Sequence, residues 1–513
     1  MEQGLREKIG QLFMVGFDAL QADDHIKTLI REKKVGGVIL FRRNVHTPAQ
    51  VSALCRELQE INAEVSDIPL LISIDQEGGM VMRIEQGVTP IPAAMAFQAA
   101  GSIEDCERMN QISGDEMRQV GINMLLAPVL DVNNNRNNPV IGVRAYGEDA
   151  ATVIDYGMAA MRGQRASGVA VTAKHFPGHG DTAIDTHYAM ALVPHDKERL
   201  HAVELAPFRA AIAGGVDAIM TAHVVFPAFE ADTSVPATLS KGVLTDLLRG
   251  EMQYQGVVIT DCLEMAAIAD GIGIAQGAIA TLQAGADIVL ISHREAQQTA
   301  AIEAVIAAVE RGDIAISRID AACARVAELK RNRAVRDWRE RPVAPPALMQ
   351  PAAMALSQLL QKAALRAQGD YRPLDAGLPV TLLTVEVRSR SEIDEVALGR
   401  NKEARSSMLP ALLEAGLDVR EYALSAEALD EEVNEAIAFA QGAQQIVLQT
   451  YNAMFVDGQR RLVEALPHDK LWLVAGRLPY DLDLAPHAQG RLAAFGCRPA
   501  ALVPVVEKLA GKA

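Results

Sequence analysis

Short runs of apolar residues recur along the first 334 residues, and each is followed by a longer stretch with apolar residues at helical spacing. Most of the runs are continuously apolar rather than alternating, which is typical of strands buried on both faces. The stretches between them, such as 51–65 and 198–214, have the periodicity of amphipathic helices. The predicted strands are Gln11–Asp18, Val35–Phe41, Pro69–Asp75, Met124–Val132, Val169–His175, Ala218–Phe226, Gly256–Cys262 and Ala286–Ser292.

This alternation of strands and helices predicts an α/β fold. Eight strand–helix units in a single span indicate a (β/α)8 TIM-type barrel over residues 1–334, since that fold usually occupies about 250 residues before insertions. A doubly wound open sheet is the competing interpretation, but eight units in one span favour a closed barrel.

The chain changes character after the predicted barrel. Prolines cluster in the segment 335–352, and because the residue before each proline is biased away from helix, this segment is expected to be a linker over the surface. Beyond it, three apolar runs separated by helical segments predict a smaller α/β sandwich domain with a parallel sheet over residues 353–513. These runs are Val380–Val385, Gln445–Gln449 and Leu471–Ala475.

Polar residues follow five of the predicted barrel strands. In such barrels, catalytic groups come from the carboxyl ends of the strands and the loops that follow them. One end of the barrel is therefore expected to collect Asp75, Arg83, Arg144, Lys174, His175, His187, His223 and Asp261. Convergence from five strands is a stronger indication of a site than any single residue.

The loop after the fifth strand, residues 174–187, is rich in glycine and titratable side chains. Asp185 stands two residues before His187, and a carboxylate near an imidazole favours a proton shuttle near neutral pH. Asp261 directly follows another strand; it is expected either at the mouth of the barrel or as an N-cap for the next helix. His175 and His179 are four residues apart, but Pro177 prevents the helix that would pair them on a metal, so no metal site is expected.

The composition of the chain excludes some classes of partner and cellular location. The 49 basic and 65 acidic residues give a net charge of -16, with no basic stripe, which argues against a nucleic-acid partner. No apolar run reaches membrane-spanning length and no signal peptide is visible, so a cytoplasmic protein is expected, or a secreted one if the chain was trimmed. Five widely spaced cysteines predict free thiols in a reducing compartment. The oligomeric state is left open between monomer and homodimer.

Four segments resemble a known family. Residues 174–187 (KHFPGHGDTAIDTH) closely resemble the signature of β-N-acetylglucosaminidases in glycoside hydrolase family 3. Segments 75–79 (DQEGG), 140–144 (VIGVR) and 260–265 (TDCLEM) resemble three further family segments, in the family's order. The resemblance covers the predicted barrel and extends more weakly into the second domain. Thr186 stands where the family usually has serine, and Met80 where an arginine is common.

The resemblance implies a retaining enzyme in which Asp261 is the nucleophile and His187, paired with Asp185, is the general acid/base. It implies that a terminal N-acetylglucosamine is bound by five further side chains, with no metal and no cofactor. Those side chains are Asp75, Arg83, Arg144, Lys174 and His175.

Low aromatic content, 4% of the residues, favours an exo-acting enzyme on small fragments over one that binds polymer. The expected substrate is a muramyl or anhydro-muramyl fragment of peptidoglycan, with chitin oligosaccharides second. Because a histidine repels an anionic acceptor less than a carboxylate does, a glycoside phosphorylase is a serious alternative. A non-catalytic sugar-binding protein and a β-glucosidase of the same family are disfavoured.

Overall fold

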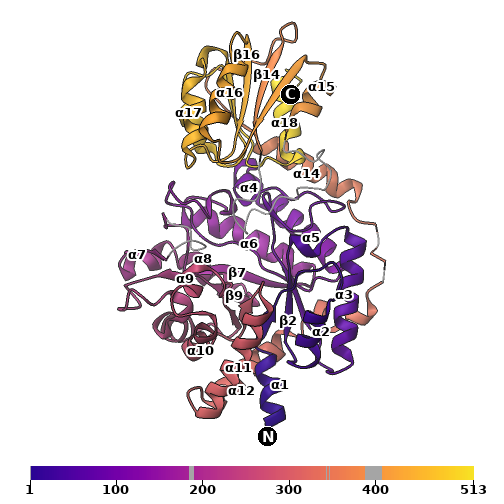
Figure 1. The fold of residues 1–513 in the computed structure, drawn as a ribbon, viewed down its shortest axis with the longest axis vertical. Coiled ribbons are helices and arrows are strands. Elements are labelled where there is room, and N and C mark those ends of the chain that lie inside the picture. Colours follow the sequence, from indigo (N-terminus) through magenta and orange to yellow (C-terminus); the bar gives the residue numbers. More distant parts are fainter. Residues whose placement is uncertain (1, 184–189, 343, 346, 387–406, 513) are drawn as a thin grey trace.

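Figure 1 shows two parts, a barrel that contains the N-terminus and a smaller domain above it that contains the C-terminus. The computed structural model describes residues 2–183, 190–342, 344–345, 347–386 and 407–512. Among these residues no helix combines the length and the apolarity that crossing a membrane would take.

Eight parallel strands form a nearly closed barrel, which confirms the predicted (β/α)8 fold. Hydrogen bonding runs in the order β11-β9-β7-β6-β3-β2-β1-β12, and a single pairing of Ile259 with Ile288 joins the two outer strands. All eight lie within the predicted apolar runs, or, for β7, one residue beyond. They are β1 (Phe13–Val15), β2 (Gly37–Leu40), β3 (Leu71–Ile74), β6 (Met124–Leu125), β7 (Ala170–Phe176), β9 (Ala218–Thr221), β11 (Val257–Ile259) and β12 (Val289–Ile291).

Helices surround this barrel, and one follows each strand. In the described part of the chain they are α2 (Asp24–Arg31), α3 (Pro48–Ala63), α5 (Ile103–Gln119), α6 (Ala150–Ala166), α8 (Ala206–Ala213), the π-helical segment η4 (Gly242–Glu251), α10 (Ile274–Ala284) and α11 (Glu295–Arg311). Shorter or peripheral helices are α1 (Glu2–Gly10), α4 (Ala94–Ala100), α7 (Lys197–Ala202), α9 (Ala266–Ala269), α12 (Ile316–Leu329) and α13 (Arg333–Arg336).

Several strands are shorter than their apolar runs. The run predicted at Met124–Val132 pairs as a strand only over Met124–Leu125. Pro128 has no N–H to donate to the neighbouring strand, so the regular ladder stops, although Leu130 N still donates to Lys174 O at 2.7 Å. The chain beyond β6 therefore stays beside β7 and carries its polar residues to the same end of the barrel.

The second domain is an α/β sandwich around a six-stranded sheet in the order β13-β18-β17-β16-β14-β15. Five strands are parallel, as predicted, whereas β13 is antiparallel to β18. The strands are β13 (Arg366–Gln368), β14 (Val380–Val385), β15 (Val419–Leu424), β16 (Gln445–Thr450), β17 (Leu471–Ala475) and β18 (Gly490–Ala493). Helices α16 (Asp430–Ala440) and α17 (Asp457–Ala465) cover one face, and α15 (Leu409–Glu414) and α18 (Pro499–Leu509) cover the other (Figure 1).

The two parts share an apolar core. Helix α4 lies directly beneath the second domain in Figure 1, and Met95 and Ala99 pack in one cluster with Leu478 and Phe495. Polar contacts flank this cluster: Arg136 of the barrel pairs with Asp483, and Asn133 Nδ2 donates to Tyr480 Oη at 3.0 Å. The carboxyl end of the barrel is thereby covered in part by the second domain.

The segment predicted as a linker runs along the outside of the barrel. It contains a short 3-10 helix, η5 (Trp338–Glu340), and α14 (Pro351–Ala364) begins within it. Trp338 is buried under the guanidinium of Arg56, and Arg341 donates to Gln119 O at 3.1 Å. The boundaries 1–334, 335–352 and 353–513 stay a prediction.

Lys330 is a buried cation at the end of α12 and offers a test of stability. Its Nζ donates to Gln11 Oε1 at 2.7 Å, and burial lowers its pKa from 10.5 to about 7. The folded state therefore binds this proton less tightly than the unfolded state, so the lysine costs stability below pH 7, and the cost fades as pH rises toward 10.5. We expect Lys330→Met to raise the free energy of unfolding by about 2 kcal/mol at pH 6, after the loss of the Gln11 hydrogen bond.

Urea unfolding at pH 6, 8 and 10 checks this expectation, with Lys241→Met as the control because Lys241 is exposed. The increase in the free energy of unfolding caused by Lys330→Met should become smaller as the pH rises and should be absent at pH 10. A stability difference that is the same at all three pH values would show that Lys330 keeps its charge when buried.

Candidate active site

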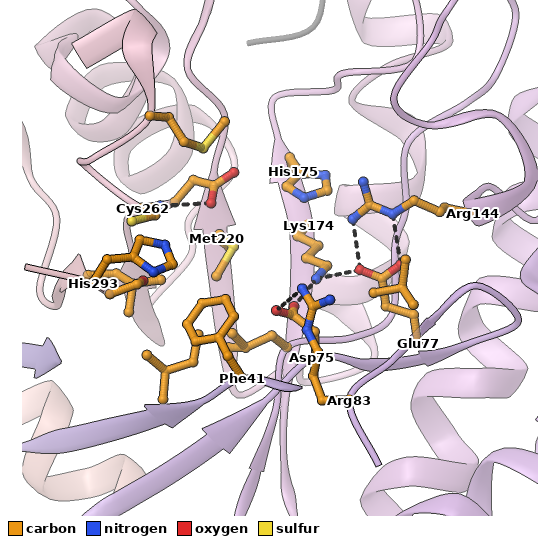
Figure 2. Close-up of a pocket in the computed structure, with 17 residues that line it drawn as sticks. Phe41, Asp75, Glu77, Arg83, Arg144, Lys174, His175, Met220, Cys262 and His293 are labelled. Atoms are coloured by element: carbon orange, nitrogen blue, oxygen red, sulfur yellow. Dashed lines mark hydrogen bonds and ion pairs between the residues drawn. The ribbon is translucent and has the colours of Figure 1, made fainter. Parts of the chain in front are cut away.

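Five charged side chains form an ion-pair network at the carboxyl end of the barrel (Figure 2). Asp75 follows β3, and Glu77 lies on β4 (Gln76–Gly78), which pairs with β5 (Val81–Met82) just before Arg83. Lys174 Nζ lies 2.8 Å from Asp75 Oδ1 and 2.6 Å from Glu77 Oε1. Arg144 binds Glu77 through two hydrogen bonds of 2.8 and 2.7 Å, and Arg83 lies 3.3 Å from Asp75. The network joins side chains from three separate parts of the barrel.

Opposite charges keep this network ionised. Burial alone would raise the pKa of Glu77, but Arg144 and Lys174 more than offset it and hold the pKa well below its usual value. Burial likewise opposes ionisation of Asp75, and Lys174 and Arg83 outweigh it to lower the pKa. Burial alone would lower the pKa of Lys174, yet the two carboxylates raise it. Three cations thus face two anions, and the excess positive charge favours oxygen-rich ligands.

A second buried group fixes the orientation of His175. The Asp131 carboxylate accepts hydrogen bonds from His175 Nδ1 at 2.7 Å and from the backbone N–H of His179 at 2.7 Å. A carboxylate can only accept, so Nδ1 carries a proton, which leaves Nε2 as the nitrogen that can accept a hydrogen bond whenever the ring holds a single proton. Burial opposes ionisation of Asp131, but His175 and His179 lower its pKa. Burial also lowers the pKa of His179 to about 4, so that ring is neutral at pH 7.

Asp261 comes two residues after β11 and lines the same pocket. Its Oδ1 accepts the backbone N–H of Cys262 at 2.7 Å. The next helix, α9, has Met265 rather than Asp261 at its N-cap, so the capping interpretation of Asp261 is wrong. Glu264 does not complete a capping box at α9 either; its carboxylate accepts backbone N–H groups of the turn between β12 and α11, including Ser292 N at 2.8 Å. Asp261 is therefore held at the pocket by its own backbone turn.

An apolar and aromatic wall completes the pocket. Phe41 follows β2 and His293 follows β12, and their rings pack at 5.1 Å between centroids. The guanidinium of Arg83 lies 5.5 Å from the centre of the Phe41 ring. Figure 2 shows Phe41, Met220 and His293 around the side of the pocket that faces away from Arg144. Charge on one side and rings on the other suit a ligand with both hydroxyl groups and an apolar ring face.

The structure brings most of the predicted site residues into a single cavity. Those lining it are Asp75, Arg83, Arg144, Lys174, His175 and Asp261. Asp185 and His187 lie in the segment 184–189, outside the described residues. His223 was also expected here, but it is fully buried and is not among the residues that line the cavity; its Nε2 lies 2.9 Å from Cys262 O.

Sequence reasoning missed four contributors: Glu77, Asp131, Phe41 and His293. Glu77 comes two residues after one predicted strand and Asp131 is the penultimate residue of another, so position and charge together were a usable signal. Phe41 ends a predicted strand and His293 directly follows one, but a phenylalanine or a histidine at such a position is common in any barrel core, so position alone did not single them out.

Two sets of described side chains have the composition of metal ligands: Cys262, Glu264 and His293; and Asp181, His195 and Glu204. In the second set a cation is already present, since Arg199 lies 2.8 Å from Glu204 and 4.0 Å from Asp181. In the first, the Glu264 carboxylate accepts backbone N–H groups. Neither set includes His175 or His179, and we propose no metal at either.

Comparison with known proteins identifies the family. The family model described as the glycosyl hydrolase family 3 N-terminal domain matches residues 4–329, which is more than half of the chain and spans the whole barrel. The chain belongs to glycoside hydrolase family 3. It is a glycoside hydrolase, and the pocket at the carboxyl end of its family 3 barrel is the place where that fold carries its chemistry.

Named relatives support a narrower assignment. The chain is 38% identical over 327 residues to a "Beta-hexosaminidase A" of Pseudoalteromonas piscicida; the match covers 60% of this chain and 54% of that protein. It is 36% identical over 293 residues to a "Beta-hexosaminidase" of Pseudomonas aeruginosa, covering 57% of this chain and 84% of the relative. A solved family 3 β-N-acetylglucosaminidase from Paenibacillus sp. is 45% identical, with a TM-score of 0.92 over 99% of this chain and 97% of its own.

Proposed function

We propose that this protein is a retaining exo-β-N-acetylglucosaminidase. Similarity to the hexosaminidases and to the full-length Paenibacillus enzyme supports β-N-acetylhexosaminidase activity. The single observation that carries the proposal is the cavity that Asp261 lines together with the ion-pair network of Asp75, Arg83 and Lys174. Retaining glycoside hydrolysis needs a carboxylate nucleophile beside the bound sugar, and the charged network beside Asp261 can hold that sugar.

In the proposed first step, the Asp261 carboxylate attacks the anomeric carbon and the bond from that carbon to the leaving oxygen breaks. His187, as an imidazolium held by Asp185, donates its proton to that oxygen. In the second step the now neutral imidazole takes a proton from water, the water oxygen attacks the anomeric carbon, and the Asp261 carboxylate leaves. Two displacements return the sugar to its original β configuration.

The charged residues would bind the terminal N-acetylglucosamine. Lys174 and Arg83 can donate hydrogen bonds to sugar hydroxyls, while Asp75 can accept them. His175 presents its acceptor nitrogen because Asp131 holds the other one. The ring of Phe41 can pack against an apolar face of the sugar.

Peptidoglycan fragments with a muramyl or anhydro-muramyl group are the substrates we propose, ahead of chitin oligosaccharides. With aromatics at 4% of the residues, the chain has few side chains for an extended row of sugar-stacking platforms. A cytoplasmic location belongs to the same proposal, since all five cysteines are free thiols, as a reducing compartment requires. The oligomeric state, monomer or homodimer, stays a prediction.

A substrate panel tests the function. GlcNAc-anhydroMurNAc, chitobiose and p-nitrophenyl β-N-acetylglucosaminide are each incubated with the protein, with and without phosphate, and the products are identified by mass and by the first anomer formed. Free β-GlcNAc supports the proposal, whereas GlcNAc 1-phosphate indicates a phosphorylase. Binding of GlcNAc without any turnover would instead indicate a sugar-binding protein.

Asp131→Asn tests how the site holds His175. The amide oxygen can take the place of Oδ1 and accept the backbone N–H groups of His175 and His179, but the amide NH2 group then faces His175 Nδ1 and cannot accept its proton, so the His175 ring loses its fixed tautomer. We expect kcat/KM on the aryl substrate to fall roughly 10- to 100-fold, as for the loss of one buried hydrogen bond to a charged group.

Asp217→Asn is the matched control for this variant. Asp217 also accepts a backbone N–H of β7, that of Val171 at 3.0 Å, but near the start of the strand, away from the pocket. It should keep the wild-type kcat/KM. Wild-type kcat/KM in the Asp131 variant would show that the orientation of His175 does not matter for turnover.

A further inference from the structure

The short hairpin of β4 and β5 carries much of the proposed sugar-binding network. Asp75 stands at its beginning, Glu77 lies within it and Arg83 directly follows it. Gln76 joins the two ends of this hairpin, since its side chain exchanges two hydrogen bonds with the backbone of Ile84, at 2.8 and 3.1 Å. The position of this hairpin therefore sets the position of the three charged groups.

The second domain holds the same hairpin from above. Arg498 Nη2 donates to the backbone carbonyl of Met80 at 2.9 Å and lies 3.0 Å from Glu85 Oε1. The side chains of Arg498 and Glu85 are 15% and 13% exposed, so the ion pair is largely shielded from water. Met80 is itself buried in the second domain, with its sulfur 3.6 Å from that of Cys497.

The two contacts of Arg498 lie on either side of Arg83. Met80 precedes Arg83 by three residues and Glu85 follows it by two. The guanidinium of Arg498 therefore binds both ends of the short segment that contains Arg83. Arg83 N also donates to Asp75 O at 3.2 Å, which couples this segment to the start of the hairpin. Arg498 immediately precedes α18, a helix packed into the core of the second domain. Its backbone lies at the N-cap of this packed helix, which fixes where the guanidinium can reach.

We propose that Arg498 is a positioning residue for the sugar-binding network, and that the second domain completes the active site through it. This inference rests on the proposed function, because it takes Asp75, Glu77 and Arg83 to bind substrate. Arg498 is absent from the lining of the pocket, so it acts through the hairpin and not by touching the sugar.

The test compares three variants on p-nitrophenyl β-N-acetylglucosaminide. Arg498→Met keeps most of the packing volume and removes both donated contacts; we expect KM to rise about tenfold with a smaller change in kcat, since misplaced binding groups weaken the hold on substrate. Arg498→Lys can place one ammonium at the site of Nη2 and is expected to restore KM to within about threefold of wild type. Asp483→Asn removes the interdomain pair with Arg136, which does not touch the hairpin, and should leave KM unchanged.

Calorimetric titration with GlcNAc and thermal unfolding accompany the kinetics. Weaker GlcNAc binding by the Met variant, reversed in the Lys variant, supports the inference. A Met variant that unfolds at lower temperature but keeps wild-type KM and GlcNAc affinity overturns it, because Arg498 would then serve stability alone.

Glu85→Ala keeps the inference testable if the Met variant fails to fold. This variant removes the ion pair between Glu85 and Arg498 by changing the barrel residue, so KM is expected to rise about threefold. The double variant with Arg498→Met should have a KM close to that of Arg498→Met alone, because both substitutions remove the same interaction. An unchanged KM in Glu85→Ala alone counts against the inference. If the wild-type protein itself hydrolyses no substrate, the proposed function is what fails; wild-type turnover with an unaffected Arg498→Met variant refutes the positioning role only.

Discussion

Asp261→Asn is expected to lower kcat on an aryl β-N-acetylglucosaminide by at least about 10⁴-fold, the scale of loss seen when a nucleophile is removed. The asparagine side chain can still accept the N–H of Cys262, as Asp261 does at 2.7 Å, so the backbone turn should stay in place. It carries no charge to attack the anomeric carbon. The loss therefore reports chemistry rather than geometry.

Asp261→Ala adds an independent check, since it leaves space beside the anomeric carbon. Azide added to this variant is expected to restore turnover of a substrate with a good leaving group and to yield a glycosyl azide, identified by mass. Asp270→Asn, on the same connection but beyond α9, is the control and should keep wild-type kcat. More than a tenth of wild-type kcat in Asp261→Asn, or a covalent sugar adduct on another side chain, would contradict the nucleophile assignment.

The sequence predicts the barrel because burial on both faces leaves a plain pattern. All four residues of β2 are buried, and so are all seven of β7. Strands of this kind read as continuous apolar runs. The apolar pattern does not show where backbone pairing between strands ends, because that depends on single features such as the missing N–H of Pro128.

The charged half of the pocket is predictable for a similar reason. Asp75, Lys174 and Asp261 each stand at the carboxyl end of an apolar run, and the topology of a parallel barrel brings such ends together. The pairing within the pocket is not predictable in this way: that Lys174 bridges Asp75 and Glu77 at 2.8 and 2.6 Å depends on the bend of the hairpin after β3.

Contacts across the two domains leave no mark in the sequence at all. Met80 stands where the family resemblance leads to the expectation of an arginine, and the sequence alone shows only that no cation is present there. In the structure Met80 is buried beside Tyr451 and Cys497, and Arg498 donates to its carbonyl group. Residues hundreds of positions apart have no shared periodicity, so only the folded structure reveals that they meet.

His187→Ala is expected to separate substrates by the basicity of their leaving groups. Without a proton donor, a disaccharide must expel a poor leaving group, so kcat/KM on GlcNAc-anhydroMurNAc should fall about 10²- to 10⁴-fold, the usual worth of general acid catalysis. A dinitrophenyl glycoside needs no proton on its leaving oxygen, so its kcat/KM should change less than about threefold. The ratio kcat/KM is the right measure, because it reports the first step of the reaction alone.

Asp185→Asn should repeat this pattern more weakly, and the double variant should lose little beyond His187→Ala, since an acid and the carboxylate that orients it act as a unit. His487→Ala, an exposed histidine of the second domain, is the control and should behave as wild type on both substrates. Equal losses on the disaccharide and the dinitrophenyl glycoside would contradict the acid role of His187. They would point instead to a histidine that binds the sugar, in which case another group must protonate the leaving oxygen.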